Sequence, residues 1–92
     1  MKEDIHYPIS MEWSKEEVIH VVEFFEMIQK AQADGIRSEL LVEQYKKFKA
    51  VVPSKREEKQ LFAEFDQAAD VSSWKTIQAA QKAEADELIK MT

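Results

Sequence analysis

Trp13-Ser14-Lys15-Glu16-Glu17-Val18 carries a complete set of signals for the start of a helix. Ser14 can cap the helix, and Glu17 occupies the third helical position, from which its carboxylate reaches back to the cap amide. Trp13 and Val18 have the spacing of a hydrophobic staple, so we expect Trp13 to be largely buried. The pattern predicts a helix over residues 15–33, with Gly35 in the left-handed conformation just beyond its end.

Three further helices follow, each bounded by residues that start or stop a helix. The second is predicted over residues 38–51, because the residue before Pro53 is pushed out of the helical region. The third is predicted over residues 55–69, where Ser54 and Glu57 form a second capping box. The fourth is predicted over residues 73–90, although its apolar face weakens after the first turns, so that its end is expected to be only partly docked.

The fold class follows from these helices and from the scarcity of turn residues. One glycine and two prolines in 92 residues are too few for a β-sandwich or a β-meander. Short connections between helices favour antiparallel neighbours. We therefore predict an all-α, four-helix, bundle-like single domain spanning residues 1–92. Before the first helix, an extended N-terminal segment is expected to place Tyr7 and Ile9 against the bundle, with disorder of the segment as the alternative.

Composition excludes several classes of protein. The chain has no cysteine, so it can hold no disulfide, thiolate metal site or cysteine nucleophile. Met1-Lys2-Glu3-Asp4 is not followed by an apolar stretch of the kind that a secretory signal needs. The longest apolar run, residues 18–25, is far shorter than the roughly 18 residues of a membrane span. We expect a cytoplasmic protein with no membrane partner.

A family resemblance rests on several short motifs spread over residues 7–80. They are Tyr7-Pro8, Gly35-Ile36, Tyr45-Lys46-Lys47-Phe48-Lys49, Val52-Pro53-Ser54-Lys55 and Glu58-Lys59-Gln60-Leu61-Phe62. With these motifs the chain resembles uncharacterised protein family 0223, a group of small proteins from low-GC Gram-positive bacteria. The resemblance implies an all-helical cytoplasmic protein without an assigned activity, and it transfers no catalytic residue. Trp74 stands where the family pattern leads us to expect a smaller aromatic residue.

No catalytic or cofactor-binding residue is predicted. Glu17-Val18-Ile19-His20 has the Glu-x-x-His spacing of carboxylate-bridged metal bundles, with Glu16 and Glu23 nearby. That chemistry needs two such motifs, whereas the chain has only His6 besides His20, and Glu17 is already used by the capping box. Two histidines, no cysteine and one glycine favour neither a nucleophile with its base nor a phosphate loop. We expect no enzyme, no cofactor and no metal.

Charge is distributed unevenly along the chain. The net charge is −5, yet residues 46–59 carry six basic side chains and two acidic ones. We call the six the basic corner; its members are Lys46, Lys47, Lys49, Lys55, Arg56 and Lys59. Lysines at the end of a helix complement its dipole, but Lys55 and Arg56 at a helix start do not. The basic corner is therefore a possible interaction surface for an acidic partner or a phosphate, and a solvated surface is the alternative.

The sequence thus predicts a non-enzymatic protein that acts through a surface for an unidentified protein partner. A nucleic-acid-associated module using the basic corner is the alternative, although an acidic chain argues against general nucleic-acid binding. A metal-binding bundle is a distant third. A partner could instead dock on the weakly docked fourth helix around Ile77, Leu88 and Met91. The sequence predicts no oligomeric state.

Overall fold

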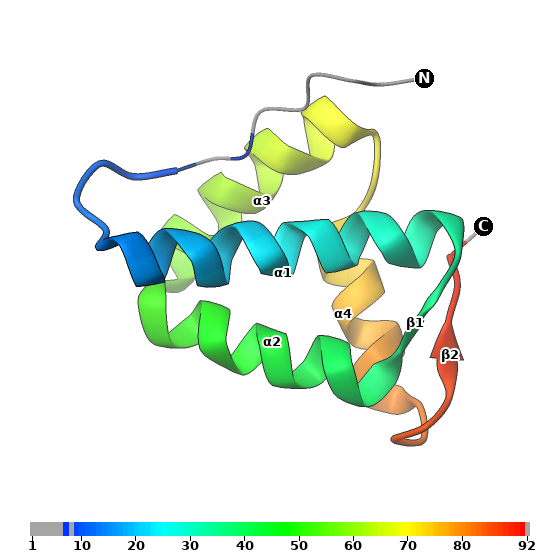
Figure 1. Ribbon diagram of the computed structural model, residues 1–92. Helices are drawn as coiled ribbons and strands as arrows, with labels where there is room; N and C mark the ends of the chain where they lie inside the picture. The colour runs from blue at the N-terminus through cyan, green and yellow to red at the C-terminus, as the bar shows by residue number, and fades with distance from the viewer. Residues whose placement is uncertain (1–6, 8, 92) are drawn as a thin grey trace.

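A computed structural model describes residues 7 and 9–91, which form four helices and one small antiparallel ribbon (Figure 1). In chain order the elements are α1 (Lys15–Ala33), β1 (Ile36–Arg37), α2 (Ser38–Val51), α3 (Lys55–Ala69), α4 (Ser73–Lys82) and β2 (Leu88–Ile89). The predicted all-α, four-helix fold is confirmed. Pro8 and residues 1–6 belong to the predicted N-terminal segment and lie outside the described residues.

The predicted helix starts are formed by the expected hydrogen bonds. Ser14 Oγ accepts from the amide of Glu17, and Glu17 Oε1 accepts from the amide of Ser14, which completes the first capping box. Ser54 Oγ accepts from the amide of Glu57 at 3.3 Å; the reciprocal bond is absent from the described part of the chain. Gly35 has φ +94° and donates its amide to the carbonyl of Lys30, so the predicted left-handed end of α1 is confirmed.

All five phenylalanines of the chain meet in the centre of the bundle: Phe24, Phe25, Phe48, Phe62 and Phe65. They come from α1, α2 and α3, and their rings pack closely, with centroids 4.7 Å apart for Phe24–Phe48 and 4.4 Å for Phe25–Phe65. Stacked and edge-to-face rings add to the free energy gained by burying these large side chains. The aromatic cluster therefore fixes how the first three helices pack.

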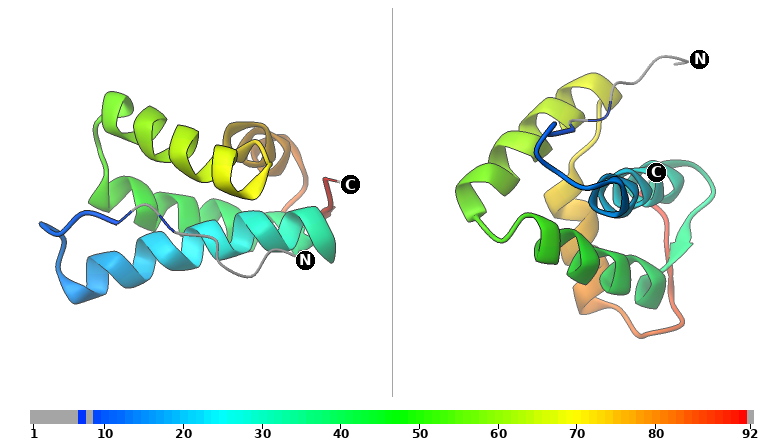
Figure 2. Two further views of the ribbon diagram at one scale, coloured as in Figure 1. Left: turned by 90° about the horizontal axis from the view of Figure 1, so that it is seen from above. Right: turned by 60° about the vertical axis from the view of Figure 1, so that its left-hand side comes forward.

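The fourth helix does not lie alongside the other three. From above, α4 is seen end-on while α1, α2 and α3 run across the view (Figure 2). Its buried face consists of Ser73, Thr76, Ile77 and Ala80. Gln32 of α1 donates its side-chain amide to Thr76 Oγ1 at 3.0 Å, which links α4 to α1. The expectation of antiparallel neighbours throughout is therefore wrong for α4.

The N-terminal segment agrees with the prediction at Tyr7 and differs at Ile9. The ring of Tyr7 stacks on Phe65 with centroids 5.9 Å apart, and its hydroxyl donates to Gln29 Oε1 at 2.8 Å. Ile9 is 49% exposed, because the chain turns away before α1, where the amide of Trp13 donates to the carbonyl of Ser10. Trp13 packs against the core, with a smaller part of the residue exposed.

The predicted end of the fourth helix is wrong. Helix α4 ends at Lys82 rather than near residue 90, and β2 pairs with β1 in the register Ile36–Ile89 and Arg37–Leu88. A helix continued over this stretch would have little to bury. The extended chain instead buries Ile89 and places carbonyl oxygens at the start of α2, so tertiary contacts override helix propensity.

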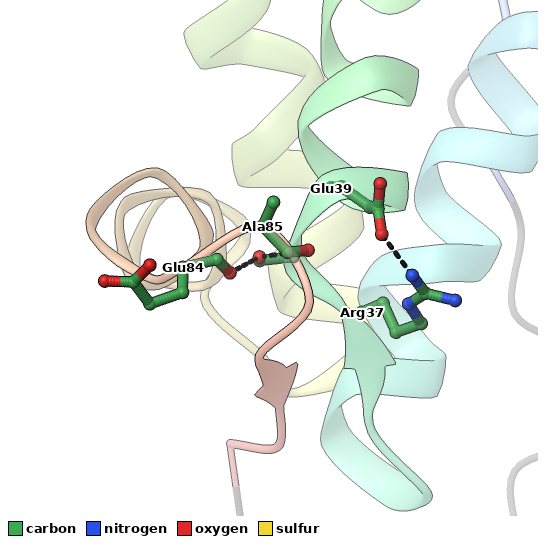
Figure 3. Close-up of polar contacts among 5 residues, drawn as sticks. Arg37, Glu39, Glu84 and Ala85 are labelled. Atoms are coloured by element: carbon green, nitrogen blue, oxygen red, sulfur yellow. Dashed lines mark hydrogen bonds and ion pairs between the residues drawn. The ribbon is translucent and has the colours of Figure 1, made fainter.

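Those carbonyl oxygens replace the side-chain cap that α2 lacks. The amides of Ser38 and Glu39 donate to the carbonyls of Glu87 and Ala85, at 2.8 and 3.0 Å. Ser38 Oγ also donates to the carbonyls of Glu84 and Ala85, and Arg37 pairs with Glu39 beside them (Figure 3). The first amides of a helix need acceptors, and here residues 84–87 supply them.

Candidate functional site

A groove opens beside the connection between α2 and α3. It has a volume of about 590 Å³, and we call it the α2–α3 groove. Its lining residues come from the last turns of α2, from one face of α3 and from the start of α4: Tyr45, Lys49, Lys55, Glu58, Lys59, Phe62, Ala63, Asp66 and Trp74. Aromatic side chains thus lie next to three lysines of the basic corner.

A buried carboxylate joins the two helices that border the groove. Glu58 of α3 is only 7% exposed, and its Oε2 accepts from the hydroxyl of Tyr45 at 2.6 Å. Its Oε1 accepts from Nζ of Lys49 at 3.0 Å. Burial, the hydrogen bond to Glu58 and the negative charge of that carboxylate together raise the pKa of Tyr45 well above its usual range. Both oxygens of Glu58 are therefore engaged within the protein.

The second carboxylate of the groove is also engaged. Asp66 Oδ1 accepts from the amide of Ser73 at 3.0 Å and from its hydroxyl at 2.6 Å. These bonds connect α3 to the first residue of α4. A carboxylate that already accepts two hydrogen bonds is poorly placed to take a proton from a substrate, so the geometry gives Asp66 a structural role.

Among the described residues, Lys55 and Lys59 differ from Lys49 in having no acidic partner. Both are exposed, and no ion pair involves either of them within residues 9–91. They lie one turn apart on α3, so their ammonium groups border the same face of the groove. Trp74 at the start of α4 lines the same groove and is 46% exposed. The groove therefore combines available positive charge with exposed aromatic surface.

The structure divides the basic corner into two groups. Lys49, Lys55 and Lys59 line the groove. Lys46 instead pairs with Glu43 at 3.4 Å on the exposed surface of α2, and neither Lys47 nor Arg56 lines the groove. Solvent-exposed pairs such as Lys46–Glu43 contribute little to stability.

Sequence reasoning missed the non-basic half of the site. Glu58 lies four residues before Phe62, on the apolar face of α3, and that position was a signal of a buried carboxylate. The sequence alone assigns no role to the hydroxyl of Tyr45. No signal in the sequence indicated that Trp74 is exposed, because that depends on how α4 crosses the bundle.

The other predicted candidates do not form sites. Glu17 is held by the capping box, and Nδ1 of His20 is buried without a hydrogen-bond partner in the described chain. Among residues 7 and 9–91 no three potential ligands of the His, Cys, Asp or Glu type gather closely enough to hold a metal ion. His6 lies outside the described residues.

The alternative docking face on the fourth helix does not exist as predicted. Ile77 is buried, whereas Leu88 is 55% exposed and lies on β2 against Gly35. The three residues of that proposed face, Ile77, Leu88 and Met91, therefore do not share one surface. In the described part of the chain, no helix is both long enough and apolar enough to cross a bilayer.

Comparison with known proteins gives one consistent result. Residues 4–89 match the profile of a family described as Uncharacterised protein family (UPF0223). A UPF0223 protein of Bacillus cytotoxicus is 42% identical over 88 residues, covering 96% of this chain and 99% of the relative. A UPF0223 protein of Lysinibacillus sphaericus is 40% identical over a match that covers 92% of this chain and 90% of the relative. One from Staphylococcus haemolyticus is 40% identical over a match that covers 82% of this chain and 83% of the relative. None of these names states an activity.

Proposed function

The chain belongs to the uncharacterised protein family UPF0223, and from that premise we propose that it is a non-enzymatic cytoplasmic protein that binds a protein partner in the α2–α3 groove. The partner segment has a large apolar side chain flanked by acidic residues. The apolar side chain packs on Phe62 and Trp74, and the acidic residues meet Lys55 and Lys59.

The observation that carries this proposal is the contrast between engaged and available charges in one groove. Glu58 and Asp66 are satisfied by Tyr45, Lys49 and Ser73, whereas Lys55 and Lys59 have no acidic partner in the described chain. The charge that the groove offers to a ligand is therefore positive. An aromatic centre with a charged rim is the usual anatomy of a site for a protein segment.

The same contrast supports a binding role over catalysis. General acid or base chemistry needs a titratable group that is free to exchange a proton with substrate. Both carboxylates of the groove instead join helices to one another. The net charge of −5 argues further against general nucleic-acid binding, which favours an excess of positive charge over the whole domain.

A peptide titration tests the proposal. The probe is a synthetic peptide with one leucine between two pairs of aspartates, added to the Trp13→Phe variant so that Trp74 is the only fluorophore of its kind. We expect saturable binding that shifts Trp74 emission and weakens as salt screens the lysines. The double variant Lys55→Glu with Lys59→Glu should lose binding while its circular dichroism stays unchanged.

Matched controls separate the two parts of the site. A peptide with serine in place of the leucine tests the apolar anchor, and one with lysines in place of the aspartates tests the charge. The Lys46→Glu with Lys47→Glu variant has the same change in charge outside the groove and should bind as the wild type does. Equal binding of all three peptides, or tight binding of a single-stranded oligonucleotide that the groove variant abolishes, would overturn the proposal.

A further inference from the structure

The turn before α1 has the chemistry that the α2–α3 groove accepts. Met11 is 99% exposed and Ile9 is 49% exposed, and the acidic side chains of Glu12 and Glu16 beside them are exposed as well. We call Ile9–Glu12 the N-terminal turn. We propose that a second copy of this chain inserts its N-terminal turn into the α2–α3 groove, so that Met11 is the apolar anchor and Glu12 and Glu16 meet Lys55 and Lys59. This inference rests on the proposed function, because it names one partner for the same groove.

The N-terminal turn is ordered by its own hydrogen bonds. The amide of Trp13 donates to the carbonyl of Ser10 at 3.3 Å, and the amide of Glu12 donates to Ser10 Oγ at 3.2 Å. Trp13 then packs against the core and holds the end of the turn in place. A preformed turn loses little conformational entropy when it binds, which favours its use as a ligand.

The placement of turn and groove suits a closed pair. The N-terminal turn and the connection between α2 and α3 lie at the same end of the molecule in both views (Figures 1 and 2). Met11 is almost fully exposed, so the turn does not occupy the groove of its own chain. Two copies related by a twofold axis can each offer the turn to the other's groove, and the contact is then made twice.

Charge supports the pairing of these two surfaces. Glu12 and Glu16 form no ion pair within the described residues, as is also true of Lys55 and Lys59. The acidic and the basic side of the contact are therefore both available. A second copy in the groove competes with any other acidic, apolar segment, so self-association lowers the amount of free site as the protein concentration rises.

Sedimentation equilibrium over a range of protein concentrations tests the inference. We expect a dimer whose dissociation constant rises by about tenfold or more between low and high salt, because its charged contacts are at the rim. Met11→Ser should weaken the dimer without changing the circular dichroism spectrum.

A charge-exchange pair makes the test specific. Variant one carries Lys55→Glu with Lys59→Glu, and variant two carries Glu12→Lys with Glu16→Lys. Each variant by itself brings like charges together at both turn–groove contacts of the dimer and should be monomeric. Mixed, they oppose unlike charges at both contacts and should form a one-to-one heterodimer. Lys30→Glu with Lys82→Glu changes the same charge far from this end of the molecule and should leave the wild-type dimer intact.

The outcomes separate this inference from the proposed function. A wild-type protein that stays monomeric at all concentrations but binds the acidic leucine peptide overturns the second copy and leaves the groove assignment standing. A dimer whose dissociation constant changes neither with salt nor in the two charge variants overturns the inference, because its interface then lies elsewhere. A dimer that follows the charge exchange, and that the acidic leucine peptide dissociates, supports both.

Discussion

Nζ of Lys49 lies 3.0 Å from Oε1 of Glu58, so an ion pair joins the last turn of α2 to the first turns of α3 across Pro53. The side chain of Glu58 is 9% exposed and that of Lys49 is 28% exposed. Tyr45, one helical turn before Lys49, donates to the other oxygen of the same carboxylate. Removing one partner of such a buried group is costly because the remaining charge loses its compensation.

Tyr45→Phe should destabilise the protein at neutral pH by about 1.5–3 kcal/mol, the usual range for a hydrogen bond to a charged group. The difference from wild type should shrink above the ordinary tyrosine pKa near 10. The pKa of Tyr45 is raised in the folded protein, so above pH about 10 the unfolded chain loses this proton while the folded chain keeps it, and wild-type stability falls. Urea unfolding from pH about 8 to about 12 measures the effect.

Tyr7→Phe is the control for that series, since Tyr7 is the only other tyrosine. Its pKa is raised too, by burial and by the charge of Glu26, but its hydroxyl donates to an uncharged Gln29. The Tyr7→Phe variant should lose about 0.5–1.5 kcal/mol of stability at neutral pH, as for a neutral hydrogen bond. Equal losses for both variants would show that Glu58 does not hold Tyr45.

Ser54→Ala should cost about 0.5–2 kcal/mol, because the amide of Glu57 loses its acceptor at the start of α3. Ser54→Gly should cost only a few tenths of a kcal/mol, since glycine leaves that amide open to water. Chemical denaturation of the two variants side by side decides the matter. An alanine variant as stable as wild type would place the helix start elsewhere.

Trp13→Ala should cost about 1.5–3 kcal/mol, because the part of the side chain that packs against the core is lost while the rest already lies in solvent. The sequence alone predicts a largely buried Trp13 and a loss of about 3–5 kcal/mol, as for other core aromatics. The structure places Trp13 on the core with part of its surface in solvent. A measured loss in the higher range would mean that the residue is more deeply packed.

Gly35→Ala should lower stability by about 1–2 kcal/mol through the backbone alone, because φ there is +94°. A Cβ at this position would also lie 2.9 Å from Cγ of Leu88. Leu88 is more than half exposed and can move aside, so the backbone term should dominate. Gly35→Ala should therefore cost the same stability in a Leu88→Ala background. If Gly35→Ala costs nothing there, the loss comes from the contact with Leu88 instead.

Ile89→Ala should cost about 2–4 kcal/mol, whereas Leu88→Ala should cost under about 1 kcal/mol. In β2 Ile89 is 5% exposed and Leu88 is 55% exposed. A helix continued to residue 90, as the sequence predicted, would turn Leu88 inward with the earlier apolar residues. The opposite order of losses would support that helix over the strand.

The helices could be predicted because the residues that start and end them lie close by in the sequence. Ser14, Ser54, Gly35 and Pro53 each act on neighbouring backbone groups, so a few residues determine where a helix begins or ends. The first three helices have the predicted bounds for this reason. Helix α4 starts as predicted but ends early, because its end is decided by acceptors for α2 and by the burial of Ile89.

The groove could be predicted only in part. The lysines were visible as a run of charge, but a run of charge does not show which side chains share a surface. Whether Lys49 is paired depends on Glu58, and whether Trp74 is exposed depends on the crossing of α4. Both are tertiary relationships between segments that the periodicity of a single helix does not relate.

The dependence of α2 on residues 84–87 sets an order of events during synthesis. Ser38 and Glu39 are added to the chain well before their acceptors, the carbonyls of Glu87 and Ala85. At about 5–20 residues per second the delay is roughly 2–10 s. During that time only water can accept from the first amides of α2, and Ile36 has no Ile89 beside it. Helix α2 and the strand before it therefore gain their full stability only after residues 84–89 have been made.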